Sequence, residues 1–402
     1  MKILQVLPKI PFPPTDGHKK SMWGVIKYLS QLGHEIEIIA YRQNENPEKV
    51  KTQIEKYAKL HVLDVSTPNS LSGALKNFAS PIPYNLSKYR KKELKEFLYD
   101  FLRGNKFDII HITNSHMGWI VDEVRKLSNA PVVLRQENLE LTIMERYYRN
   151  QTNPVLKLFS YFQYKKFLRY EPALCSKFDR VIMMNGEDSR GLQSLNPYIK
   201  CSVIPLGVEK ELLSLKNSEE EKLSIAHIGS LNWYPNLDGF LWFVDNIFPS
   251  IVDKKPGAKL YIYGSDLPKK IRIREDVRNN IIVKGFVGDV WNELANKALV
   301  VIPLRIGSGI RVKILELLAA GKFVVTTSIG KEGIPAINKK ELLIADNEMD
   351  FVKDILDCFD HKYNTQEITS NGRKLVEENY LWEIIARRFE ILYSELVTEK
   401  TK

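Results

Sequence analysis

The chain has few cysteines and no long apolar run. Its three cysteines, Cys175, Cys201 and Cys358, are widely spaced and match no zinc-ligand or CxxC pattern, so we expect buried free thiols in a reducing compartment. No segment approaches the roughly 18 to 20 consecutive apolar residues of a membrane-spanning helix. The apolar stretch within residues 1–14 is too short for a signal peptide. These absences predict a cytoplasmic protein.

Acidic residues are outnumbered in the first half of the chain. Residues 1–200 hold 31 Lys and Arg against 20 Asp and Glu, whereas residues 201–402 hold 28 against 29. The net charge of +10 therefore belongs to the first half. Clustered positive charge attracts phosphate, nucleic acid or anionic lipid headgroups. A basic face that only keeps the protein soluble explains the excess equally well.

The length of 402 residues exceeds what one hydrophobic core usually organises, so two domains are expected. The chain opens with strand 2–7, an amphipathic helix from about His18 to Leu32, and strand 35–40. This βαβ unit implies a parallel sheet. Further strands of the first half are expected at 107–112, 131–134, 180–184 and 202–205.

A polar stretch, Lys216–Lys222, precedes a second series of alternating strands and helices. The sequence therefore predicts an α/β protein of two Rossmann-like, doubly wound domains. The strands of the second series are expected at 223–228, 259–263, 281–284, 299–304 and 323–327, and its helices at 237–248, 289–297 and 310–320.

The segment with the strongest functional pattern spans residues 299–328. A buried strand is followed by a tight turn, Gly307-Ser308-Gly309, and by a helix that starts near Ile310. Backbone N–H groups and the macrodipole make such a helix N-terminus an anion site. Arg311 and Lys313 add cations to the first turn, where positive charge is unfavourable unless an anion compensates it.

Glu316 lies three residues after Lys313, near the same helical face. Its carboxylate is a candidate acceptor for ribose hydroxyls. An ion pair between Glu316 and Lys313 and a purely solubilising Arg311 are the structural alternatives.

This segment resembles the donor-binding helix of retaining glycosyltransferases of family 4, which have the GT-B fold. That family carries a Glu, seven further residues, and a second Glu before a small-residue helix end, and Glu316 to Gly321 matches the second half. Ser308 stands where the first Glu belongs, as in the branch that reads GSGxRxKxLE. The resemblance implies two domains facing a central cleft, with Ser308, Gly309 and Ile310 at the donor.

Two further segments match the family in the expected order. Gly229 and Ser230 follow a strand and resemble the loop that approaches the diphosphate, while Asn236 would cap the next helix. Gly285 and Phe286 resemble the wall of the nucleobase pocket.

Residues 379–396 resemble the terminal helix of the family, which crosses back to the N-terminal domain. We therefore place an N-terminal acceptor domain at residues 1–205, a C-terminal donor domain at 206–379, and helix 380–402 packed on the first domain.

The N-terminal half supplies the other site candidates. Gly17 occupies the loop that faces the donor phosphate in the family. His111 ends a strand at the edge where parallel sheets bind ligands, and it matches the family's Asp-x-x-His, which implies a catalytic role. His116 is the second candidate, and a structural strand-end histidine is the alternative. Glu137 and Asn138 follow the next strand and are candidates for contact with the acceptor.

The resemblance implies transfer of a hexosyl or N-acetylhexosaminyl group from a nucleotide-sugar to a glycan or lipid-linked acceptor, with retention by a same-face displacement. Arg311 and Lys313 would stabilise charge on the leaving diphosphate. No Asp-x-Asp pair occurs, in agreement with cations replacing a metal ion. We expect no cofactor, no bound metal and no nucleic acid partner, and a role in surface polysaccharide or glycoconjugate synthesis.

Three other functions compete with sugar transfer. A nucleotide-sugar epimerase of the same fold would need no acceptor. A dinucleotide oxidoreductase would use the GxG at Gly307, but Val312 stands where the third glycine of GxGxxG belongs. A non-catalytic nucleotide-sugar binding protein is the third.

Two basic stretches interleave cations with aromatic residues and leucines, at 84–102 and 145–170. Amphipathic helices of this kind lie in membrane interfaces. We expect an anionic membrane surface as a partner, with the protein peripheral on the inner face of the cytoplasmic membrane. The alternative is that the aromatic residues form core and the cations are ordinary surface.

Overall fold

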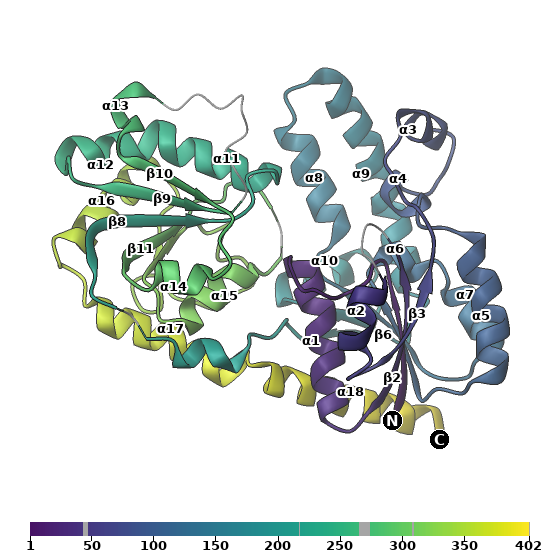
Figure 1. Ribbon diagram of the computed structural model, residues 1–402. Helices are drawn as coiled ribbons and strands as arrows, with labels where there is room; N and C mark the ends of the chain where they lie inside the picture. Colours follow the sequence, from purple (N-terminus) through teal and green to yellow (C-terminus); the bar gives the residue numbers. More distant parts are fainter. Residues whose placement is uncertain (43–46, 217, 265–273, 308, 402) are drawn as a thin grey trace. The chain divides into compact units, whose positions relative to one another are not determined.

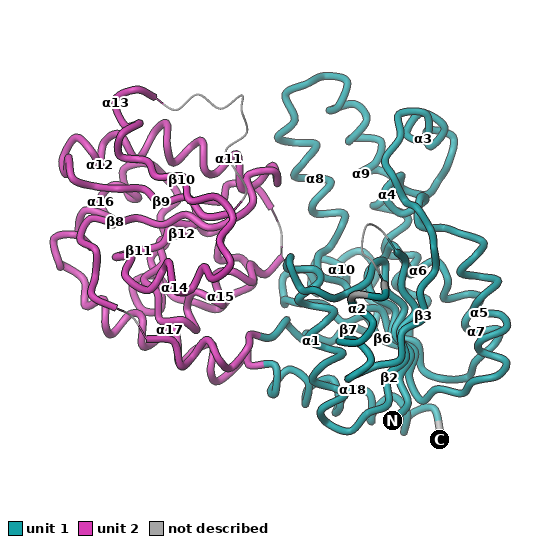
Figure 2. Tube along the Cα trace, viewed as in Figure 1, with its two compact units in different colours: residues 1–207, 382–402 teal, residues 208–381 magenta. Residues whose placement is uncertain are grey.

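A computed structural model describes residues 1–42, 47–216, 218–264, 274–307 and 309–401. The chain divides into two compact units (Figure 2). Unit 1 comprises residues 1–207 and 382–402, and unit 2 comprises residues 208–381. The units meet after residues 207 and 381. The domain boundaries expected from sequence, after residues 205 and 379, each lie two residues earlier. The polar stretch Lys216–Lys222 falls within unit 2.

Unit 1 is built on a seven-stranded sheet in which every neighbouring pair is parallel. The strand order is β3-β2-β1-β4-β5-β6-β7, so the chain winds outward from β1 in one direction and from β4 in the other. The strands are β1 (Lys2–Leu7), β2 (Glu35–Tyr41), β3 (Lys59–Leu63), β4 (Ile109–Thr113), β5 (Val132–Gln136), β6 (Arg180–Met183) and β7 (Cys201–Val203).

Helices cover both faces of this sheet, as the doubly wound prediction requires (Figure 1). The helices of unit 1 are α1 (Gly17–Gln31), α2 (Pro47–Ile54), α3 (Leu71–Asn77), α4 (Tyr84–Ser87), α5 (Lys92–Gly104), α6 (Ser115–Gly118), α7 (Val121–Leu127), α8 (Glu140–Asn150), α9 (Pro154–Cys175), α10 (Gly186–Leu195) and α18 (Trp382–Thr401).

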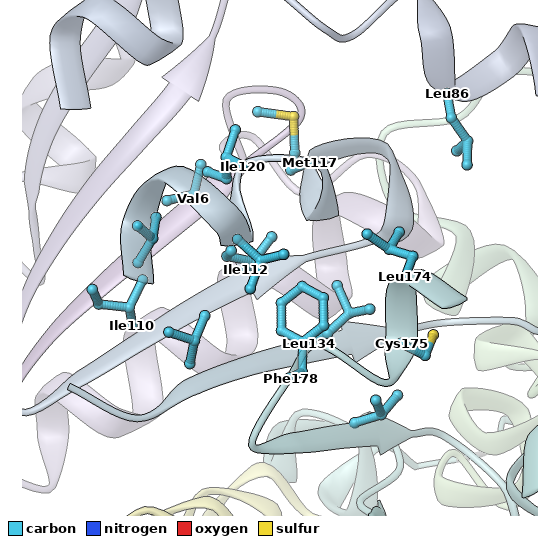
Figure 3. Packing of buried hydrophobic residues seen from close by; sticks show 14 of the residues in the cluster. Val6, Leu86, Ile110, Ile112, Met117, Ile120, Leu134, Leu174, Cys175 and Phe178 are labelled. Carbon is cyan, nitrogen blue, oxygen red and sulfur yellow. The ribbon is translucent and has the colours of Figure 1, made fainter. Parts of the chain in front are cut away.

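One face of the sheet buries alternate apolar residues against α5, α7 and α9. Val6, Ile110, Ile112 and Leu134 point from β1, β4 and β5 into this core, as period-two alternation along strands requires (Figure 3). Cys175 at the end of α9 is part of it, and burial raises the pKa of its thiol. Cys358 is also buried, whereas Cys201 is half-buried, and all three thiols are free.

The opposite face carries α1 and the C-terminal helix α18. The indole of Trp382 fills the space beside Gly24 of α1 and Gly207, where an added Cβ would clash with it on either side. Its ring stacks on Tyr28 with centroids 6.0 Å apart. Two glycines therefore create the slot that fixes the start of α18 on unit 1.

Unit 2 repeats the architecture with a six-stranded parallel sheet of order β10-β9-β8-β11-β12-β13. Its strands are β8 (Glu221–Ile228), β9 (Lys259–Tyr263), β10 (Ile281–Gly285), β11 (Lys297–Ile302), β12 (Val324–Thr326) and β13 (Leu343–Ile344). Its helices are α11 (Tyr234–Trp242), α12 (Phe248–Lys254), α13 (Glu275–Arg278), α14 (Val290–Leu294), α15 (Val312–Ala319), α16 (Glu348–Phe359) and α17 (Thr365–Asn379), with a 3₁₀ turn at Lys210–Ser214.

Among the described residues, no helix combines the length and the apolar character that crossing a membrane requires.

In both sheets the winding direction reverses at one point, between β1 and β4 in unit 1 and between β8 and β11 in unit 2. Open α/β sheets bind ligands beyond the carboxyl ends of their strands at such a point. Each unit therefore has one edge where a site is expected.

Candidate functional site

In unit 2, three glycines stand at the carboxyl ends of the neighbouring strands β8, β9 and β10, the first two just after their strands and the third as the last residue of its strand. Gly229, Gly264 and Gly285 all have positive φ angles, of 145°, 135° and 69°. Gly264 N–H donates to the Gly285 carbonyl at 2.9 Å, and Gly229 N–H donates to the Tyr263 carbonyl at 3.0 Å. A Cβ on Gly264 would clash with the Gly229 carbonyl. The strand ends thus pack backbone against backbone, which requires glycine.

The side chain of Lys313 reaches back from α15 to this edge. Its ammonium donates to the Ile228 carbonyl at 3.1 Å and to Oδ1 of Asn236 at 3.0 Å. A Cβ on Gly229 would lie 2.9 Å from Nζ. Burial, and secondly the charge of Arg311, lowers the pKa of Lys313 to about 7. The structure therefore brings three of the sequence candidates, Gly229, Lys313 and Asn236, into contact.

The role expected for Asn236 is wrong in one respect. Helix α11 begins at Tyr234, so Asn236 lies within its first turn and does not cap it. Its amide instead donates to the Ser230 carbonyl at 2.9 Å and accepts from Lys313. Asn236 therefore ties the loop after β8 to the cation of α15.

Arg311 precedes α15 and lies over the glycine turn. The helix begins at Val312, two residues later than expected, because Gly309 has a left-handed φ of 80° and Arg311 is extended. A Cβ on Gly307 would clash with the guanidinium of Arg311. Two cations thus lie at the start of one helix, where the macrodipole is also positive. An anion bound there would be attracted by both cations and by the helix N-terminus.

The remaining candidates of unit 2 lie around the same edge or outside the described residues. Ile310 is buried in the loop after β11, and Glu316 is half-buried one turn beyond Lys313 on α15. Phe286 follows Gly285 with its ring 88% exposed, a surface available to a planar base. Ser308 lies outside the residues that the structure describes.

In unit 1, His111 is buried between the sheet and α18. Its Nδ1 lies 2.6 Å from the hydroxyl of Tyr393, and its ring stacks on Phe389 with centroids 6.1 Å apart. Burial, and secondly the charge of Arg135, lowers the pKa of His111 to about 3. The geometry accords with the structural alternative, and the catalytic role of His111 stays a prediction.

His116 lies on α6 just beyond the end of β4. Its Nδ1 is 2.5 Å from Oδ1 of Asn114, a residue with a positive φ of 70°. The imidazole packs edge-on against Tyr89 at 4.8 Å, and burial lowers its pKa to about 4. His116 is therefore held as a neutral ring at the ligand edge of unit 1.

Glu137 lies beside the first turn of α1 at the same edge. Its Oε1 lies 3.8 Å from Nε2 of His18, next to the exposed Gly17 that begins α1. Burial raises the pKa of Glu137 to about 8 although Arg135 opposes the shift, and burial lowers the pKa of His18 to about 3. Both groups are thus mainly neutral at pH 7. Sequence reasoning singled out Glu137 and Gly17 but assigned no role to His18.

A buried glutamate that sequence reasoning missed supports this edge. Glu171 of α9 accepts from Nε2 of Gln136 at 3.1 Å and from the backbone N–H groups of Glu140 and Leu141 at 3.1 and 2.8 Å. Gln136 in turn accepts from the Ser115 N–H at 2.9 Å. Glu171 therefore caps α8 and joins the ends of β4 and β5. Asn138, between these groups, is half-buried.

Comparison with known families covers both units. Residues 15–212 match the model of Glycosyltransferase Family 4, and residues 222–361 match that of Glycosyl transferases group 1. An uncharacterized 44.6 kDa protein in the cps region of Klebsiella pneumoniae is 22% identical over 387 residues, covering 94% of this chain and 96% of the relative.

Solved structures with the same fold include glycosyltransferases. A glycosyltransferase from Rickettsia africae superposes with a TM-score of 0.69 at 17% identity, over 98% of each chain. The Anabaena protein HepE in complex with UDP gives a TM-score of 0.69 at 13% identity, over 98% of this chain and all of that one. With two parallel-sheet α/β units and matches to both family models, the chain belongs to the glycosyltransferases of GT-B fold.

Proposed function

We propose that the protein transfers a hexosyl or N-acetylhexosaminyl group from a nucleotide-diphosphate sugar to a glycan or lipid-linked acceptor, with retention and without a metal ion. The Anabaena structure of the same fold holds UDP, which supports a nucleotide-sugar donor. The Klebsiella relative lies in the cps region, which supports a role in surface polysaccharide synthesis.

The observation that carries the donor proposal is the cation pair of Lys313 and Arg311 at the start of α15. Burial and the charge of Arg311 lower the pKa of Lys313 to about 7, so a nearby negative charge would stabilise its protonated form. A diphosphate is a dianion that would interact with both cations and with the N-terminus of α15. A Cβ on Gly229 would lie 2.9 Å from Nζ of Lys313. Because glycine lacks this atom, the backbone at Gly229 could approach the phosphates closely.

The same cations support metal independence. In sugar transfer the leaving diphosphate gains negative charge as its bond to the sugar breaks, and a divalent metal ion is one means of stabilising that charge. Two fixed cations and a helix N-terminus are another, because they are oriented before the reaction begins. We assign this role to Lys313 and Arg311.

The other donor contacts follow from position. Glu316, one turn beyond Lys313, would accept hydrogen bonds from the ribose hydroxyls. The exposed ring of Phe286, after the third strand-end glycine, would stack on the base. Gly309 and Ile310 would contact the sugar through the backbone.

We place the acceptor at the ligand edge of unit 1. His18 and Glu137 present neutral hydrogen-bonding groups 3.8 Å apart there, and His116 presents a third. In the transfer step, the acceptor hydroxyl forms a bond to the anomeric carbon on the face from which the diphosphate leaves. The hydroxyl proton passes to the departing phosphate oxygen, so charge and atoms balance without a protein base.

The test is a transfer assay with the full chain, a panel of nucleotide-sugars, and a lipid and oligosaccharide extract as acceptor, with and without excess EDTA. We expect release of nucleotide diphosphate that EDTA does not change. Proton NMR of the product should show the anomeric configuration of the donor. An inverted product, activity restored only by magnesium or manganese, or an epimerised sugar formed from donor alone would each contradict the proposal.

A further inference from the structure

Two segments of unit 1 contain no acidic residue. Residues 65–92 and 146–170 together hold 11 Lys and Arg and neither Asp nor Glu. The rest of the chain holds 48 Lys and Arg against 49 Asp and Glu. The positive excess of the protein therefore comes entirely from these two segments.

The two segments pack against each other. Nε2 of Gln163 donates to Oδ1 of Asn77 at 3.1 Å, and the Tyr84 N–H donates to Oε1 of Gln163 at 2.8 Å. The ring of Phe78 lies 5.9 Å from that of Phe159 and 5.6 Å from that of Phe162. Helices α3 and α9 thus present one continuous surface, at the end of unit 1 where α8 and α9 meet (Figure 1).

This surface exposes large apolar side chains at helical spacing. On α3, Leu71 is 87% exposed and Leu75 is 69% exposed, and they share a face with Phe78. On α9, Val155 is 74% exposed and Leu158 is 58% exposed, and they share a face with Phe162. The Phe78–Phe162 contact joins the two faces. An apolar strip of this kind indicates a binding surface.

Exposed cations lie on the same two helices. Lys76 is exposed on α3, and Lys157 and Lys165 are exposed on α9. We call this region the basic apolar surface. It consists of these three lysines and six apolar residues: Leu71, Leu75, Phe78, Val155, Leu158 and Phe162.

Part of the expected membrane-binding region does not belong to this surface. In α5, Leu94, Leu98 and Leu102 are buried in the core, and Phe97 and Phe101 pack against it. The alternative reading, that the aromatic residues form core, is therefore correct for α5. Lys166 is also occupied, because its ammonium donates to the backbone and side-chain oxygens of Asn77 at 2.5 and 2.9 Å.

We propose that the basic apolar surface docks on an anionic membrane. Anionic headgroups would meet the lysines, and the leucines, Val155 and the phenylalanines would enter the acyl boundary. A second copy of the chain fits less well, because pairing this surface with itself would bring together two sets of cations with no acidic residue among them. The inference is independent of the donor site, since no residue of unit 2 contributes to it.

The test is co-sedimentation of the full chain with phosphatidylcholine vesicles and with phosphatidylcholine–phosphatidylglycerol vesicles over a salt series. We expect binding to the anionic vesicles that weakens as salt rises, because headgroup attraction is screened beyond about 10 Å at 0.1 M salt. Little binding to neutral vesicles is expected.

Two variants remove one property each. Lys157→Glu with Lys165→Glu should lower the affinity for anionic vesicles at least tenfold. Leu75→Ser with Val155→Ser and Leu158→Ser should also lower it at least tenfold. The matched controls are Lys254→Glu with Lys353→Glu, which gives the same change of charge on unit 2, and Ile337→Ser with Met349→Ser and Ile391→Ser, which removes three exposed apolar residues elsewhere. Both controls should bind as wild type does.

Two results would overturn the proposal. One is no binding of wild type to anionic vesicles at low salt. The other is self-association in sedimentation velocity that the Leu75 triple variant abolishes, which would assign the surface to a second copy. Donor binding, measured by calorimetry on the same variants, should stay unchanged, so that failure of this inference is distinguished from failure of the donor site.

Discussion

The ammonium of Lys313 lies 3.0 Å from the side-chain oxygen of Asn236, and its other acceptor is the backbone carbonyl of Ile228 at 3.1 Å. Both acceptors are neutral oxygens, and the charged neighbour that lowers the pKa of Lys313 is Arg311. Within the part of the chain that the structure describes, two neutral oxygens orient this cation. A bound anionic ligand should therefore stabilise the protonated form of Lys313.

The first prediction is that nucleotide-sugar binding weakens above pH 7. A bound diphosphate should raise the pKa of Lys313 from its value of about 7. Below pH 7 the free protein already carries this proton, so binding takes up none. Above pH 7 binding must take up a proton, so affinity should fall by up to about tenfold per pH unit until the pKa of the complex is reached.

Calorimetry between pH 6 and 9, in buffers of different ionisation enthalpy, measures both the affinity and the proton uptake. Lys313→Gln should lose the pH dependence, since glutamine does not titrate. A flat affinity profile without proton uptake at pH 8 in the wild type would show that the diphosphate does not contact Lys313.

The second prediction concerns Gly264, which follows β9 directly. A Cβ there would clash with the Gly229 carbonyl, and the φ of 135° is strained for alanine. We expect Gly264→Ala to lower the free energy of unfolding by about 1–3 kcal/mol and to weaken donor binding, because the loop after β8 must move.

Gly288→Ala is the matched control, since among the described residues, its two chain neighbours aside, no atom lies within 4 Å of the Cβ it would add. Thermal unfolding and calorimetric titration of both variants decide the matter. Equal unfolding temperatures and equal donor affinities of the two alanine variants would show that Gly264 does not support the donor site.

The third prediction separates the two readings of His111. Tyr393→Phe removes the hydroxyl that lies 2.6 Å from Nδ1, which should cost about 1 kcal/mol of stability. His111→Gln should lower the unfolding temperature further, because a buried ring that stacks on Phe389 is lost.

If the histidine is structural, transfer by the folded fraction of both variants stays close to wild type. His116→Gln is the comparison, because that ring lies at the ligand edge of unit 1. A fall in kcat of a hundredfold or more for folded His111→Gln would instead restore the catalytic role.

Most strands of the two sheets lie close to the ranges expected from sequence. β1 and β9 match their expected ranges at both ends, and β10 ends one residue later than expected. β4 and β5, in which every residue is buried, begin and end within two residues of the expected positions. Two strands are not predicted from the sequence: β3, whose only buried residue is Leu60, and β13, which has two residues. An edge strand with Lys59 and His61 carries little apolar periodicity.

Helix 237–248 was expected as one element, but the chain forms α11, a π-helical segment at Phe243–Ile247, and α12. The wider π turn and Pro249 are accommodated by packing of Phe243 and Phe248 in the core of unit 2. Apolar residues at helical spacing are present throughout, so local sequence does not reveal the change of pitch.

The residues of the candidate site can be predicted only in part from the sequence. Glycines that follow strands signalled Gly229 and Gly285, and the same signal at Gly264 was overlooked. The burial of His111 depends on Tyr393, which lies 282 positions away in the chain. The capping of α8 by Glu171 spans 31 positions. Contacts of that range depend on the tertiary fold and leave no local pattern.

The central claim is that the diphosphate of the donor binds beside Lys313. Its most direct test is calorimetric titration of wild type and Lys313→Gln with UDP, GDP, ADP and dTDP at pH 6.5. Glutamine retains a donor for Asn236 and Ile228 but no charge, so the fold is kept and a charge-assisted bond of about 1.5–3 kcal/mol is lost. At least one nucleotide diphosphate should bind wild type and bind Lys313→Gln about 10- to 150-fold more weakly. Equal affinity in the two proteins would contradict the account.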